Sequence, residues 1–452
     1  MEHVTLLITV VIVTALAFDF TNGFHDTANA MATTISTGAM APRAAVAMSA
    51  VLNLVGAFLS VEVARTISGG IIDEEAGVRP EVIFAGLVGA IVWNLVTWLA
   101  GLPSSSSHAL FGGLIGATLA SAGTDAVNGD AVLTKVIVPA LAAPLVAGIA
   151  ALLATRLTYR LTRDADERAS ARGYRVGQIA SAALVSLAHG TNDAQKTMGV
   201  MTLALITGGS LAPGSDPPLW VIASAGTAIA LGTYLGGWRI IHTLGKGLTD
   251  MQPAQGFAAQ TGAATTILAS SHLGFALSTT QVCSGAVLGS GLGRRGGVVR
   301  WSTAGRMAVA WCLTLPAAAV VGALGALLAD QGDWGVAAVF VLLLLAGVGI
   351  WQRSRRDPID HTNVTEPRPG SPTAPAADAP GALSAEAPAP AATAPGAKPE
   401  QPVPGTAEAP AAVDAAAEPA AMPFAAEPGV PLIIPTPQAA PAPHPTATDP
   451  VS

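Results

Sequence analysis

Charged side chains are scarce in this sequence, and their scarcity excludes most classes of soluble protein. Only 11% of the 452 residues are charged, whereas 51% are hydrophobic. A soluble domain normally carries about 25% charged residues. A lipid bilayer is the solvent that suits such a composition. We therefore expect a protein whose long apolar runs lie in a membrane.

An excess of basic residues is also missing, and this excludes a nucleic-acid binder. The net charge of −7 comes from the end of the chain, since residues 357–452 carry 11 acidic and two basic residues. The residues before Asp357 have a net charge of +2. We therefore expect no nucleic acid among the partners of this protein.

Cysteine is nearly absent, with Cys283 and Cys312 alone in the chain. Both stand in apolar surroundings, and their spacing fits neither a metal site nor a disulfide framework. We interpret them as ordinary helix residues. The first residues, MEHVTLL, lack the basic region and the small-residue cleavage site of a signal peptide. The first apolar stretch is therefore expected to remain as a helix.

A series of apolar segments fills the chain from Val4 to Trp351 and predicts an all-α polytopic membrane protein. We expect about 10–12 membrane segments. Several segments are short and rich in glycine, and these carry the polar residues. Such segments predict a broken or re-entrant helical hairpin in each half of the protein.

Arginines predict the orientation and the organisation of the chain. Residues 156–175 hold six arginines and should form a basic cytoplasmic linker by the positive-inside rule. This linker separates a first membrane half, residues 1–155, from a second half with the last span, residues 176–356. Residues 357–452 are dominated by Ala and Pro and predict a disordered cytoplasmic tail. Residues 4–40 could cross the membrane once or twice, and one crossing would place the N-terminus outside.

Two kinds of motif recur in the same order in the two halves. Asp193 follows Asp26 at an offset of 167 residues, and Thr279 follows Ser106 at an offset of 173. The charges of the flanking loops predict opposite orientations for the two copies. This pattern indicates an inverted-topology repeat, which secondary transporters use for alternating access.

The first kind of motif places a carboxylate within an apolar stretch. The copies are NGFHDTANA at 22–30 and HGTNDAQK at 189–196. A charge at mid-bilayer costs at least about 2.5 kcal/mol, so it needs a partner or a bound ion. The alternative to ion binding is a structural role. Asp26 would then only form hydrogen bonds between helices, and Asp193 would only form an ion pair with Lys196 on one helix face. The predicted cation-coupling residues are Asp26, Asn29, Asp193, Asn192 and His25, with Gln195 and Lys196 in support.

The second kind of motif is a hydroxyl-rich turn that enters a short glycine-rich helix. The copies are LPSSSSH at 102–108 and LSTTQ at 277–281. The free amides and the dipole at a helix N-terminus favour an anion, and hydroxyls donate to its oxygens. Plain N-capping is the alternative. The predicted anion-binding residues are Ser105, Ser106, Ser107, Ser278, Thr279 and Thr280, with His108 and Gln281 in support. We predict no catalytic residue and no protein-held metal.

Four stretches resemble the signatures of the Pit-type inorganic phosphate transporters. They are NGFHDTANAMAT at 22–33, WNLVTWLAGLPSSSSH at 93–108, HGTNDAQKTMGV at 189–200 and LSTTQ at 277–281. The resemblance does not cover the Ala/Pro tail. It implies two inverted halves, commonly a homodimer in the cell membrane, and no cofactor other than Na⁺ or H⁺ as the coupling ion. It also implies that phosphate is sometimes carried as a neutral complex with a divalent metal.

Two positions depart from the common pattern of this family. His25 stands where many members have Asn, which resembles the bacterial proton-coupled branch. Gln281 stands where many members have His, so a shared role of two turn histidines is lost and only His108 remains.

The expected function is import of inorganic phosphate by symport with H⁺ or Na⁺, with alternating access to a midplane anion site. Sulfate is the closest alternative cargo, but phosphate can donate a hydrogen bond to Asp26 or Asp193 and sulfate cannot. An intramembrane hydrolase with Ser106 or Ser107 as nucleophile would leave the second hydroxyl turn unexplained. A scaffold that acts through its tail would need a folded module there.

Overall fold

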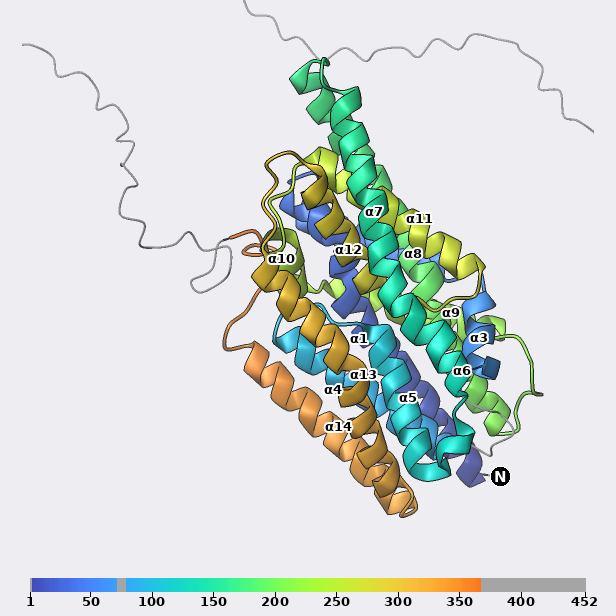
Figure 1. Ribbon diagram of the computed structural model, residues 1–452. Helices are drawn as coiled ribbons and strands as arrows, with labels where there is room; N and C mark the ends of the chain where they lie inside the picture. The colour runs from blue at the N-terminus through green and yellow to red at the C-terminus, as the bar shows by residue number, and fades with distance from the viewer. Residues whose placement is uncertain (1, 71–78, 367–452) are drawn as a thin grey trace, which may run out of the picture. The chain divides into compact units, whose positions relative to one another are not determined.

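A computed structural model describes residues 2–70 and 79–366 of the chain (Figure 1). Within these residues the structure is helical and has no strand beyond one isolated bridge, so the predicted all-α class is confirmed. The helices of the first half are α1 (Glu2–Ser36), α2 (Pro42–Gly56), α3 (Glu62–Gly70), α4 (Pro80–Leu99), α5 (Ser106–Ala122), α6 (Gly129–Val132) and α7 (Val138–Leu161). Those of the second half are α8 (Glu167–Thr207), α9 (Leu219–Leu235), α10 (Trp238–Gly247), α11 (Pro253–His272), α12 (Thr279–Gly293), α13 (Trp301–Ala329) and α14 (Asp333–Ser354).

Five of the described helices are long and apolar enough to cross a bilayer. These spans are Leu6–Ser36, Pro80–Leu99, Gly129–Leu161, Trp301–Ala329 and Asp333–Ser354. The pair α9 and α10 passes the same test together, but it bends by 65° at a short break and is either a broken span or a re-entrant loop. The protein is therefore a multi-pass membrane protein.

The two carboxylate motifs lie within long unbroken helices. Most of the stretch 4–40, which could have crossed once or twice, is one helix, α1, and this favours a single crossing. The second motif lies in α8, a helix of 41 residues. The Asp166 carboxylate caps α8 by accepting the N–H of Ala169 at 2.8 Å. Residues 156–175, the predicted basic linker, are consequently helical except for a turn at 162–166.

Each hydroxyl-rich turn is the tip of a helical hairpin, as the short segments predicted. Residues 100–105 join α4 to α5, and residues 273–278 join α11 to α12. Gly101 has a φ of +64° and Gly274 a φ of +72°. Only glycine adopts this backbone without strain, so the same residue makes the same bend in both tips.

Each short tip helix packs against a long helix of the other half. A Cβ on Gly116 of α5 would lie 2.0 Å from the carbonyl oxygen of Ala319 in α13. A Cβ on Gly289 of α12 would lie 1.9 Å from the carbonyl oxygen of Gly148 in α7. These matching contacts are compatible with the predicted inverted repeat. The tip helix of each half thus packs against a helix of the other half, and all described residues belong to one compact unit.

The expected tail begins ten residues too early. Residues 357–366 contact the helical part of the chain: Val364 is buried and Ile359 packs beside it. Arg239 donates to the carbonyl of Asp357, and the Nε2 atom of His242 lies 3.0 Å from the carbonyl oxygen of Glu366. The prediction of disorder is therefore wrong for residues 357–366, because two apolar side chains and two carbonyls find partners there. Residues 367–452 lie outside the described residues.

Candidate functional site

The two motif carboxylates lie close together between α1 and α8 and are shielded from solvent. Asp26 is 1% exposed and Asp193 is 0% exposed. Their helices are held by matching glycine contacts: a Cβ on Gly23 or on Gly190 would lie 2.3 Å or 2.2 Å from a backbone oxygen of α9 or α2. Larger residues at these two positions would push the carboxylate helices away from their supports.

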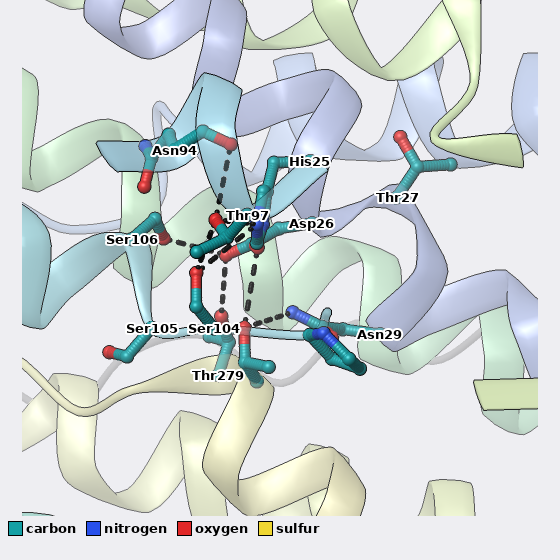
Figure 2. Close-up of polar contacts among 12 residues, drawn as sticks. His25, Asp26, Thr27, Asn29, Asn94, Thr97, Ser104, Ser105, Ser106 and Thr279 are labelled. Atoms are coloured by element: carbon teal, nitrogen blue, oxygen red, sulfur yellow. Dashed lines mark hydrogen bonds and ion pairs between the residues drawn. The ribbon is translucent and has the colours of Figure 1, made fainter. Parts of the chain in front are cut away.

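Hydroxyls from both hairpin tips reach these carboxylates, and Figure 2 shows Ser106 and Thr279 beside Asp26. The Ser106 hydroxyl of α5 donates to Asp26 Oδ2 at 2.7 Å. The Thr279 hydroxyl of α12 donates to Asp193 Oδ2 at 3.0 Å and also lies 3.4 Å from Asp26 Oδ2. The two tips, 173 residues apart in sequence, therefore meet at one pair of acids.

Lys196 is the buried cation of the site, with no exposed surface. Its ammonium forms an ion pair with Asp193, as the plain structural alternative predicted. It also donates to the Ser107 hydroxyl of one tip at 2.6 Å and to the Leu277 carbonyl of the other at 3.0 Å. Lys196 thus connects both tips to α8, in addition to neutralising a carboxylate on its own helix.

A histidine stands beside each carboxylate. The Nδ1 atom of His25 lies 2.6 Å from Asp26 Oδ1, and its Nε2 atom lies 3.3 Å from the Thr97 hydroxyl (Figure 2). The Nε2 atom of His189 lies 3.0 Å from Asp193 Oδ2 and 4.0 Å from Asp26 Oδ2. His189 was not among the predicted site residues, although it opens the second motif. Its spacing of four residues before Asp193, one helical turn, could have indicated it.

Asp26, His189 and Asp193 can also hold a metal ion. Each offers one ligand atom, and these atoms all lie within 4.8 Å of one another. Carboxylate oxygens and a neutral imidazole are a donor set that divalent cations accept. The prediction of no metal did not foresee this cluster, because His189 comes near Asp26 only through the packing of α8 on α1.

The structure divides the predicted anion-binding residues into two groups. Ser105 and Ser278 are N-caps, whose side chains accept the N–H groups of His108 at 3.1 Å and of Gln281 at 3.3 Å. Figure 2 shows the Ser105 side chain turned away from Asp26. The hydroxyls of the two residues after each cap face the carboxylates or the residues that bind them. Thr280 accepts from the Asn29 amide at 3.0 Å and lies 3.3 Å from Asp26 Oδ1.

Four other predicted residues lie apart from the carboxylates. Asn192 donates to Ser271 at 2.9 Å, and Gln195 accepts the N–H of Val63 at 2.8 Å, which fixes α3. His108 and Gln281 line an apolar cleft of about 820 Å³ between α7 and α13. A second cavity of about 970 Å³ is lined by arginines at the ends of α7 and α12. Neither of these two cavities contains Asp26 or Asp193, so their volume says nothing about the carboxylate site.

Comparison with known proteins points to one family. The model of the phosphate transporter family matches residues 22–172 and 161–322. A probable low-affinity inorganic phosphate transporter of Mycobacterium tuberculosis (strain H37Rv) is 59% identical over 371 residues, which cover 81% of this chain and 89% of that protein. A protein of the same description from Bacillus subtilis (strain 168) is 42% identical over 328 residues, covering 72% and 97%. Among solved structures, a sodium-dependent phosphate transporter matches with a TM-score of 0.64 and 22% identity, covering 75% of this chain and 99% of that one, which shows a shared fold.

Proposed function

We propose that this chain, which belongs to the phosphate transporter family, imports inorganic phosphate across the cell membrane in symport with H⁺ or Na⁺. The observation that carries the proposal is the meeting of two hydroxyl-bearing helix N-termini at one buried pair of carboxylates. Each element of this arrangement has a separate task in binding an anion together with a cation.

The phosphate would bind between the two tips. Helix N-termini favour anions through their free amides and their dipole. Ser106, Ser107, Thr279 and Thr280 supply hydroxyl donors there, and Lys196 supplies a buried positive charge. The carboxylates accept hydrogen bonds from the protonated oxygens of phosphate. A sulfate ion has no such protons, so the acids favour phosphate as cargo.

Electrostatic balance explains why a cation must accompany the phosphate. Asp26 and Asp193 bring two negative charges and Lys196 one positive charge, so the site is already negative when its histidines are neutral. Adding an anion in a region of low dielectric is costly unless a cation enters with it. Asp26 and Asp193 would bind that cation. If a divalent metal is carried with phosphate, Asp26, His189 and Asp193 would hold it.

Alternating access would follow from moving one hairpin at a time. Ser106 holds the α4–α5 tip at the site and Thr279 holds the α11–α12 tip, while Lys196 donates to both tips. Releasing one set of bonds opens the site on one side and leaves the other tip closed. The predicted opposite orientation of the two hairpins would place these openings on opposite faces of the membrane.

Uptake of labelled phosphate into proteoliposomes tests this function. The purified protein should accumulate phosphate when an inward Na⁺ or pH gradient is imposed, and the gradient that drives uptake identifies the coupling ion. Excess unlabelled phosphate should compete, and excess sulfate should not. Accumulation driven equally well without any cation gradient would contradict symport, and competition by sulfate at equal concentration would favour a general oxyanion carrier.

A further inference from the structure

A second buried carboxylate on α1 has no role in the site described above. Asp19 has no exposed surface, and neither of its carboxylate oxygens has a hydrogen-bond partner among the described residues. A buried charge is strongly unfavourable unless it is paired or neutralised. A group of this kind needs an explanation, because buried polar atoms normally find partners.

Two polar side chains next to Asp19 are also unsatisfied. The side chains of Asn22, one turn along α1, and of Thr197 on α8 lie close to the Asp19 carboxylate and can interact with it. None of these contacts has the geometry of a hydrogen bond, and the amide atoms of Asn22 and the hydroxyl of Thr197 have no other partner within the described part of the chain. Three neighbouring buried side chains thus present oxygens to one another without a well-formed hydrogen bond, which is the arrangement of a ligand site.

Asp19 has no counterpart in the second copy of the sequence repeat. The offset of 167 residues that pairs Asp26 with Asp193 pairs Asp19 with Ser186, whose hydroxyl donates to the Ala182 carbonyl at 2.9 Å. The second half therefore has no equivalent carboxylate. The charged or titratable groups that face Asp19 from α8 are Asp193 and His189. Helix α9, which also packs along α1, has no acidic, basic or histidine residue.

We propose that Asp19, Asn22 and Thr197 form a further binding site for the coupling cation; the proposal rests on the symport proposed above. Asp19 precedes Asp26 by seven residues, so the two carboxylates lie on the same face of α1, about 10 Å apart along its axis. The ligand is a monovalent cation that neutralises the carboxylate: a proton on Asp19, or Na⁺ held by the carboxylate, amide and hydroxyl oxygens. A cation bound here would lie next to the phosphate site without occupying it.

The test compares two measurements on the reconstituted protein. Phosphate exchange between equal solutions on both sides needs no net cation movement, whereas accumulation against a gradient does. For Asp19→Asn, the ratio of accumulation to exchange should fall at least about tenfold, because a charged ligand of the cation is lost. Asp19→Glu, which keeps the carboxylate, should recover most of the ratio. If the wild-type protein shows no exchange, the proposed function itself fails.

Two further variants help to identify the cation and keep the proposal testable if Asp19→Asn misfolds. Thr197→Val keeps the shape and removes the hydroxyl, so the cation concentration that gives half-maximal uptake should rise severalfold. Separate runs use a Na⁺ gradient at equal pH and a pH gradient without Na⁺. If Asp19→Asn does not insert, Asn22→Ala and Thr197→Val carry the same test. Wild-type accumulation ratios in these variants, or an equal loss of exchange and accumulation in folded Asp19→Asn, would overturn the proposal.

Discussion

The buried acids at the centre of the molecule are compensated in different ways. Asp26 is hydrogen-bonded to hydroxyls and to His25, whereas Asp193 is paired with the ammonium of Lys196. Asp26 can therefore exchange its hydroxyl donors for a cation without leaving a buried lysine unpaired. At the level of single residues, the two halves of the repeat have the same acid in different electrostatic settings.

Replacing either acid should abolish transport. We expect Asp26→Asn or Asp193→Asn to lower the initial rate of phosphate uptake by at least about tenfold, because a charged ligand of the cation is lost. Uptake into proteoliposomes at matched protein content measures this effect. Asp216→Asn, which removes an exposed carboxylate in the 208–218 loop, is the control and should transport as the wild type. Normal uptake by a site variant would remove that carboxylate from the pathway.

The exposed Asp216–Arg65 pair should give a small pH-dependent stability. The hydrogen bond from Arg65 and its charge lower the pKa of Asp216 below its ordinary value of 3.8. A group with a lowered pKa stabilises the fold above its unfolded pKa and loses that contribution as the pH falls through the folded pKa. Asp216→Asn should therefore lower the Tm slightly at neutral pH, and the difference should shrink as the pH falls below 3.8 through the lowered pKa of the folded state. Thermal unfolding in detergent measures it; a difference that grows in acid would contradict this assignment.

At the scale of elements, the hairpin tips combine two functions in consecutive residues. The first hydroxyl residue caps the helix, and the following ones face the buried charges.

Mutations should separate the capping function of the tips from their anion-binding function. Ser106→Ala and Thr279→Val should raise the KM for phosphate by about tenfold, because a hydroxyl bonded to an anion is lost. Ser105→Ala and Ser278→Ala should cost about 1 kcal/mol of stability with little change in KM. A plot of uptake rate against phosphate concentration distinguishes these outcomes, and unchanged KM values in all four variants would mean that the tips are caps alone.

The exchange of packing partners between the halves depends on glycine. Gly116→Ala and Gly289→Ala would place a methyl group against a backbone carbonyl, so the helices must separate. We expect each to destabilise the protein by about 1–3 kcal/mol. Gly347→Ala is the matched control, since nothing lies within 4 Å of its added methyl group in α14. Thermal unfolding in detergent should show lower Tm values for the first two variants, and a Tm loss in Gly347→Ala of equal size would refute the packing argument.

At the scale of the whole molecule, residues 357–366 at the end of the described chain contact α10. Deleting residues 367–452 should leave phosphate uptake and stability unchanged, because their composition predicts no packed core. Deleting from residue 358 onward should cost about 2 kcal/mol, since the burial of Val364 is lost. Both truncations are compared by uptake and by thermal unfolding. A transport defect in the deletion of residues 367–452 would assign a function to the tail.

The homodimer that the family resemblance implies concerns the same scale and stays a prediction. The outward faces of α13 and α14 are largely apolar and exposed, for example at Leu324, Val341 and Leu345. Apolar faces of this kind suit lipid, as expected for spans of a membrane protein.

The sequence by itself determined the class of the molecule, its buried acids and its two kinds of motif. These features are local: hydropathy, spacing and a fixed offset can be read along one dimension. It also determined that the hydroxyl turns would begin helices, because caps depend on residues a few positions apart. Local reasoning was less accurate at the start of the tail, where residues 357–366 contact the helical part of the chain.

The tertiary structure alone decided which of these residues meet. The contact between Thr279 and Asp26 joins residues 253 positions apart, and no spacing rule along the chain predicts it. The same holds for His189 beside Asp26 and for Asn192 and Gln195, whose side chains have other partners. It also holds for Asp19, whose carboxylate forms no well-formed hydrogen bond with any described residue. Which face of a helix meets which neighbour depends on how the helices pack, and that packing depends on the close glycine contacts between distant segments.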